Sequence, residues 1–105
     1  MHRIETIDKN QNLNQEYTLA YKGNDIAHTV NCHLLVTLNA RTISKKDFSF
    51  KNLISGEKVK LKNTVDLSKI NGFNFDTPNH QTKIIIKWVG PDNKENTKEI
   101  EVLKD

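Results

Sequence analysis

The chain has 105 residues, of which 35% are hydrophobic, 28% charged and 7% aromatic, and its formal net charge is +3. This length is typical of one domain, and the longest apolar runs, residues 34–36 and 84–86, are far too short to span a membrane. One cysteine excludes an internal disulfide framework and a cysteine-rich zinc site, and the small net charge does not by itself indicate a polyanionic partner.

The first residues carry no targeting signal. Residues 1–5 read Met-His-Arg-Ile-Glu and lack the apolar stretch of a secretory leader. This leaves two interpretations open, a cytoplasmic protein or an excised domain of an exported or membrane-anchored one. The lone cysteine, Cys32, is compatible with either redox environment.

Apolar residues recur at every second position along most of the chain, which is the pattern of β-strands. Residues 3–7 are expected to form a first strand, so that residues 1–14 make a peripheral strand followed by a polar linker. The next strand ends at Tyr21 and a turn at residues 22–25 follows. Pairing Tyr21 with Ile26 brings the apolar faces of the flanking segments together and predicts a hairpin.

The longest strand follows this turn and has two distinct faces. The expected inward face holds Ile26, His28, Val30, Cys32, Leu34, Val36 and Leu38. Residues 47–50 and 59–67 alternate in the same way, and residues 67–70 are expected to form one helical turn. The connections 41–47 and 71–81 are interpreted as loops.

The C-terminal segment predicts a second hairpin. Apolar residues alternate over residues 84–88 and again over residues 100–102, with turn-forming residues between them. Pairing Ile86 with Ile100 places Lys87 opposite Glu99 on the outer face, an opposite-charge pair that favours this register.

Seven to eight short, mostly antiparallel strands with regular turns predict one all-β domain over residues 1–105, a β-sandwich or barrel. Residues 17–30 resemble the opening of bacterial immunoglobulin-like modules, where a strand ends in an Asn/Gly turn and an Ile/Ala pair leads a strand rich in Val and Leu. Residues 55–57, Ser-Gly-Glu, resemble the turn before the fifth strand of those modules. The resemblance implies an immunoglobulin-like β-sandwich.

A second, local resemblance concerns the middle of the chain. Residues 30–35, Val-Asn-Cys-His-Leu-Leu, followed by residues 40–44, Ala-Arg-Thr-Ile-Ser, are similar to a strand pair in the C-terminal β-domains of animal transglutaminases. Those domains are also immunoglobulin-like and carry no catalytic residues. This resemblance therefore implies the same fold and no activity.

The histidines and the cysteine are candidate metal ligands. On a strand, His28 and Cys32 share a face but lie about 13 Å apart, and His33 points the other way. His80 is distant in the sequence. We therefore expect no metal site, and we expect Cys32 to be a small buried core residue.

The sequence offers no candidate catalytic group. A reactive thiol needs exposure and an electropositive setting, which an inward Cys32 lacks. Glu99 and Glu101 lie on a strand face that is expected to be solvated, and the four glycines form no phosphate-binding cluster. We expect neither enzymatic activity nor a cofactor.

Two candidate contact surfaces remain. Lys58, Lys60 and Lys62 line one face of a strand, with three further lysines near them in the sequence. Lysines on a strand protect an edge from aggregation, and they also bind nucleic acid, acidic glycans or anionic lipids. Against polyanion binding, no arginine or exposed aromatic residue is interleaved with them.

The second candidate surface is a loop contact formed by Phe73, Phe75 and His80. The sequence as a whole favours a non-catalytic module that binds a protein partner or acts as a spacer, for example within a larger surface protein. The alternative is a weak binder of polyanions through the three lysines.

Overall fold

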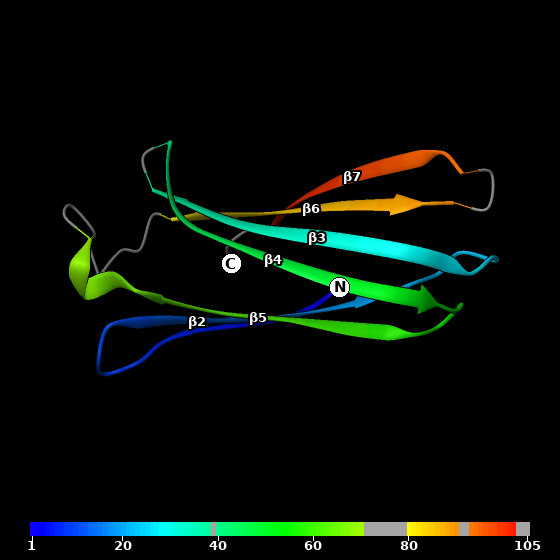
Figure 1. Ribbon diagram of the computed structural model, residues 1–105. Coiled ribbons are helices and arrows are strands. Elements are labelled where there is room, and N and C mark those ends of the chain that lie inside the picture. The colour runs from blue at the N-terminus through cyan, green and yellow to red at the C-terminus, as the bar shows by residue number, and fades with distance from the viewer. Residues whose placement is uncertain (39, 71–79, 91–92, 103–105) are drawn as a thin grey trace.

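The computed structural model describes residues 1–38, 40–70, 80–90 and 93–102. This part of the chain forms β1 (His2–Ile7), β2 (Asn12–Ala20), β3 (Ala27–Leu38), β4 (Arg41–Leu53), β5 (Lys58–Asp66), the 3₁₀ turn η1 (Leu67–Lys69), β6 (Gln81–Val89) and β7 (Glu95–Val102). The strands make a three-stranded sheet, β1-β2-β5, and a four-stranded sheet, β4-β3-β6-β7 (Figure 1). Each strand pairing is antiparallel. The all-β prediction is confirmed.

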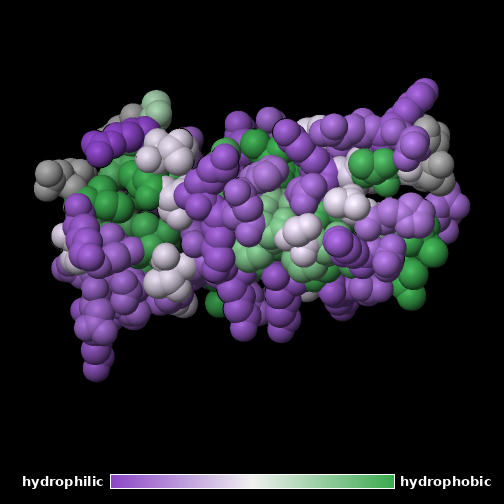
Figure 2. Space-filling view, in the orientation of Figure 1, coloured by the Kyte–Doolittle hydropathy of each residue, from purple (hydrophilic) through white to green (hydrophobic). Residues whose placement is uncertain are grey.

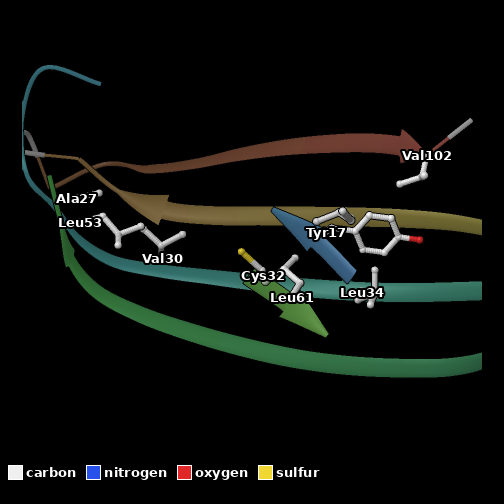
Figure 3. Packing of buried hydrophobic residues seen from close by; sticks show 9 residues of the cluster. Tyr17, Ala27, Val30, Cys32, Leu34, Leu53, Leu61 and Val102 are labelled. Carbon is white, nitrogen blue, oxygen red and sulfur yellow. The ribbon is translucent and has the colours of Figure 1, made fainter. Parts of the chain in front are cut away.

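The two sheets pack face to face around a shared core. Tyr17 and Leu61 of the three-stranded sheet belong to the same buried cluster as Cys32, Leu34 and Ile84 of the four-stranded sheet (Figure 3). A second buried cluster lies nearer η1 and contains Leu13, Val36, Val65 and Leu67. Each fully buried aliphatic or aromatic side chain of this kind stabilises the fold by about 1.5–3 kcal/mol.

The inward face predicted for the longest strand is correct over most of its length. Every second residue of β3 from Val30 to Leu38 is buried. The start of the pattern differs, because Ala27 is buried whereas Ile26 is 46% exposed and His28 is exposed. Ala27 pairs with Leu53, which is also buried, so at this end of the β3–β4 pair both strands turn the opposite set of residues toward the core.

The predicted hairpin between β2 and β3 is wrong. β2 pairs with β1 and β5, and β3 pairs with β4 and β6, so residues 21–26 cross between the sheets. The Tyr21 backbone instead extends the pairing with β5, donating to Glu57 O at 2.8 Å and accepting from Gly56 N at 2.7 Å. Tyr17 and Val30 do share one core, but they enter it from opposite sheets.

The C-terminal hairpin is present, but its predicted register is wrong by two residues. Ile84 pairs with Ile100, and Lys87 pairs with Thr97 rather than with Glu99. A shift of two keeps each side chain on its predicted face, because strand side chains alternate with a period of two. The carboxylate of Glu99 instead lies 3.7 Å from Lys83 Nζ.

The connection expected at residues 41–47 is not a loop. It forms the first half of β4, which runs 13 residues from Arg41 and pairs with β3. The segment reads as polar because β4 is an edge strand whose outer face is exposed. Of the other expected loop, 71–81, residues 71–79 lie outside the described residues, and Gln81 begins β6.

The predicted first strand and helical turn are both present, as β1 and η1. β2 already begins at Asn12, so four residues separate it from β1. In that turn, Asp8 accepts hydrogen bonds from the backbone N–H groups of Asn10 and Asn12. Asp66 caps η1 by accepting from Ser68 N at 3.0 Å.

Candidate interaction surfaces

The three predicted lysines share one exposed face of β5. Lys58, Lys60 and Lys62 alternate with inward residues and point outward from an edge of the three-stranded sheet. Alternate side chains on a strand lie roughly 7 Å apart, so the three amines form a short, regular row. Lys60 Nζ lies 3.5 Å from Glu16 Oε1. Within the described part of the chain, no ion pair reaches Lys58 or Lys62.

β4, the edge strand of the other sheet, adds one lysine, Lys46, beside this row. Lys46 pairs with Leu34 and therefore points toward the interior of the sandwich. Its Nζ donates to the carbonyl oxygen of Lys62 at 2.8 Å and lies 5.3 Å from the centre of the Phe48 ring. An inward-pointing lysine at an open edge occupies a backbone acceptor that another strand would otherwise use.

These residues together form one surface, which we call the basic edge. Its lysines are Lys46 of β4 with Lys58, Lys60 and Lys62 of β5. Phe48 and Phe50 of β4 are only partly buried and pack against the core beside them. In Figure 2, seen as in Figure 1, hydrophilic side chains cover β4 and β5 and apolar ones are visible between them.

A buried polar layer crosses the sandwich between the two apolar clusters. The register places Glu5, Gln15 and Asn63 in one inward-facing row of the three-stranded sheet. Asn63 Nδ2 donates to Gln15 Oε1 at 3.0 Å and to Ser44 Oγ at 3.3 Å, and Gln15 Nε2 donates to Thr82 Oγ1 at 2.9 Å. These bonds join both sheets at their centre. The sequence carries a signal for this layer, since its members occupy inward positions that the strand pattern reserves for apolar residues.

The polar layer continues to His80, whose predicted place in an exposed loop contact is wrong. His80 is only 3% exposed, and its Nε2 lies 2.5 Å from Glu5 Oε1. Tyr17 Oη donates to the other carboxylate oxygen of Glu5 at 3.0 Å. Burial raises the pKa of Glu5, but His80, Tyr17 and Gln15 together outweigh it, so the pKa lies below its ordinary value. Burial chiefly raises the pKa of Tyr17, with the Glu5 charge adding to it.

The other residues considered as metal ligands lie apart. Cys32 is buried, and burial raises the pKa of its thiol to about 11. His33 points to the outer face, where its Nδ1 lies 2.6 Å from Asp47 Oδ1, and this bond chiefly lowers the pKa of Asp47. His28 Nδ1 lies 3.4 Å from Asn52 Oδ1. The described residues contain no cluster of three or more His, Cys, Asp or Glu side chains suited to a metal ion.

The remaining predicted contact residues, Phe73 and Phe75, lie outside the described residues. No helix in the part of the chain that the structure describes combines the length and apolarity needed to cross a membrane. Comparison of the chain with protein-family models, curated proteins and solved structures found no match.

Proposed function

We propose that this chain is a non-catalytic interaction module with an immunoglobulin-like fold, and that it binds an acidic protein segment along the basic edge. The strand order supports the fold. An immunoglobulin sandwich places its first, second and fifth strands in one sheet and its third, sixth and seventh in the other. Here β1, β2 and β5 are in one sheet, and β3, β6 and β7 are in the other together with β4. This arrangement corresponds to the variant in which the fourth strand joins the second sheet.

The observation that carries the proposal is the row of exposed lysines along β5, beside Lys46 of β4. An extended peptide repeats its side chains at the same interval as a strand, roughly 7 Å for alternate residues. A segment with alternating acidic residues therefore matches Lys58, Lys60 and Lys62 one for one. The row is short, which suits a peptide of about five residues better than a long polyanion.

The chemistry of the interior supports a binding role rather than catalysis. The thiol of Cys32 is enclosed in the core, and its raised pKa leaves little thiolate at neutral pH. The carboxylate of Glu5 is held by His80 and Tyr17 inside the sandwich. Neither group is placed to meet a substrate from solution.

A second candidate function is polyanion binding by the same lysines. It is favoured by the lack of ion pairs at Lys58 and Lys62 within the described residues and by the half-buried Phe48 and Phe50 nearby. Phosphates, glycan sulfates and anionic lipid headgroups all meet lysine through charge alone, and such binding weakens steeply as salt is raised.

The test compares the triple variant Lys58→Glu, Lys60→Glu, Lys62→Glu with a control carrying the same charge change elsewhere, Lys9→Glu, Lys87→Glu, Lys98→Glu. Three probes are titrated by calorimetry at two salt concentrations: an extended peptide with alternating glutamates, heparin, and single-stranded DNA. We expect the peptide to bind the native chain and the control, and to bind the triple variant at least tenfold more weakly.

Equal peptide binding by both variants would refute the proposed site. Tight, salt-sensitive binding of heparin or DNA without peptide binding would establish the second candidate instead. Far-UV circular dichroism of every variant shows whether the sandwich is intact.

A further inference from the structure

The outer face of the four-stranded sheet departs from the alternation of its strands. Leu35 of β3 and Ile85 of β6 both point outward, yet both are only half-buried. They lie in adjacent cross-strand rows, because Leu35 pairs with Lys83 and His33 pairs with Ile85. The two side chains thus place apolar surface on the central strands of a face whose edges are charged.

Charge divides this face into two opposite sides. At one edge, β4 turns Lys45 and Lys51 outward, since they pair with the outward-facing Leu35 and Thr29. At the other edge, β7 turns outward three acidic residues, which pair with Lys83, Ile85 and Val89. These three residues are Glu95, Glu99 and Glu101.

The strand register places opposite charges at the two ends of single rows. One row runs Lys45, Leu35, Lys83, Glu101 across the four strands. Another runs Lys51, Thr29, Val89, Glu95. A two-fold axis parallel to the strands keeps every residue in its row but places β4 of one copy over β7 of the other. Lys45 then meets Glu101 of the second copy, and Lys51 meets Glu95.

We propose that this face binds a second copy of the chain in a two-fold dimer, with Leu35 and Ile85 on its two central strands and four intermolecular ion pairs along its edges. A two-fold axis perpendicular to the strands would place lysine over lysine, so the charge pattern selects one orientation. The proposal is independent of the basic edge function, because Lys58, Lys60 and Lys62 belong to the other sheet.

The size of the face sets the strength of the dimer. Four strands about 4.8 Å apart and four rows about 7 Å apart cover roughly 500 Å². This is below the roughly 800 Å² per partner of a standard stable interface, so we expect a weak dimer that dissociates on dilution. A third row places Asp47 over Glu99, but His33 and Lys83 of the same chain already lie against these two carboxylates.

The test uses two charge-reversed proteins, Lys45→Glu/Lys51→Glu and Glu95→Lys/Glu101→Lys. Each alone places like charges in the two rows, so its dimer should dissociate at least tenfold more readily than the native dimer. When the two are mixed, every intermolecular pair is again opposite in charge, and a mixed dimer should form. Sedimentation velocity distinguishes the native dimer, the dissociated variants and the mixed dimer. It is run from 10 μM to 1 mM, roughly the range of dissociation constants expected for an interface of this size.

A matched control separates register from bulk attraction. Lys58→Glu/Lys60→Glu has the same net charge as Lys45→Glu/Lys51→Glu but leaves the proposed face unchanged. Mixed with Glu95→Lys/Glu101→Lys, it should form a mixed dimer at least tenfold more weakly than Lys45→Glu/Lys51→Glu does, because two of the four intermolecular pairs then join its Lys45 and Lys51 to introduced lysines. A native chain that remains monomeric at 1 mM, or a control mixture that associates as strongly as the matched one, would overturn the proposal.

Discussion

Replacement of Glu5 by alanine tests whether the buried polar layer holds the two sheets together. The Glu5 side chain is 24% exposed. One of its carboxylate oxygens forms a hydrogen bond with His80 Nε2, and the other accepts a hydrogen bond from Tyr17 Oη. Alanine removes both hydrogen bonds, each with a net contribution of about 1–1.5 kcal/mol, and leaves the buried His80 without this acceptor. We therefore expect Glu5→Ala to lower the free energy of unfolding by about 2–3 kcal/mol. Glu5→Gln keeps one acceptor oxygen and should cost about 1 kcal/mol.

Urea unfolding, followed by the fluorescence of the single tryptophan, Trp88, and by far-UV circular dichroism, measures these differences. The control is Glu16→Ala on the adjacent strand, whose carboxylate lies 3.5 Å from Lys60 Nζ at the surface of the sheet. It should cost no more than about 0.5 kcal/mol. If Glu5→Ala costs as little as Glu16→Ala at an unchanged slope with urea, the layer does not contribute to stability as described.

Three further outcomes follow from the structure. Folding lowers the pKa of Glu5 from its ordinary value of 4.5, so ionised Glu5 stabilises the folded chain fully above that pH and loses this effect as the pH falls below it. The difference in the free energy of unfolding between the native chain and Glu5→Gln should therefore narrow from pH 6 to pH 3. A constant difference would contradict the assignment. Cys32→Ala should lower the free energy of unfolding, measured in urea, by about 1 kcal/mol. A thiol reagent should label Cys32 far more slowly in the native chain than in the unfolded chain. Equal labelling rates would show that the thiol is exposed. Gly56 adopts a φ of +87°, and a Cβ atom added there would meet open space. Gly56→Ala should therefore lower the free energy of unfolding by about 1 kcal/mol through backbone strain alone. An unchanged urea midpoint would show that the turn relaxes without cost.

The sequence predicts which residues face the core better than it predicts which strands pair. Val30 to Leu38 alternate as expected, and Cys32 is buried as expected. The hairpin between β2 and β3 is wrong because matching apolar faces is a weak test. Two strands that meet across a core satisfy it as well as two strands that share a sheet, and only long-range packing distinguishes the two cases.

The errors at β4 and β7 have a related cause. Register in a hairpin is specified by the turn and by side-chain packing, and a shift of two residues leaves the pattern of faces unchanged. The opposite-charge pair Lys87–Glu99 therefore favoured a plausible register that the strands do not adopt. At the start of β4, polar residues such as Lys45 reflect exposure at an edge, which the local pattern does not distinguish from a loop.

The candidate site was predicted in part. The lysines of β5 are exposed and share a face as expected, since alternation alone fixes this. The contribution of Lys46 and Phe48 depends on β4 lying beside β5, which the sequence does not show. His80 was expected at an exposed loop, because its partner Glu5 is 75 residues away in the sequence.

The crossing of residues 21–26 between the sheets also affects how the chain folds. Without a hairpin there, β2 finds one of its partners, β5, across about half of the chain, with Leu13 opposite Val65. Contacts between such distant segments raise the contact order, because a long loop must close before any bond between them forms. The three-stranded sheet should therefore assemble later than the local pairs β3–β4 and β6–β7, and the chain should fold in roughly milliseconds to seconds. During that interval β2 has only the short strand β1 as a local partner. Its inward face, Leu13, Gln15 and Tyr17, is then open to contact with other chains until β5 pairs with β2.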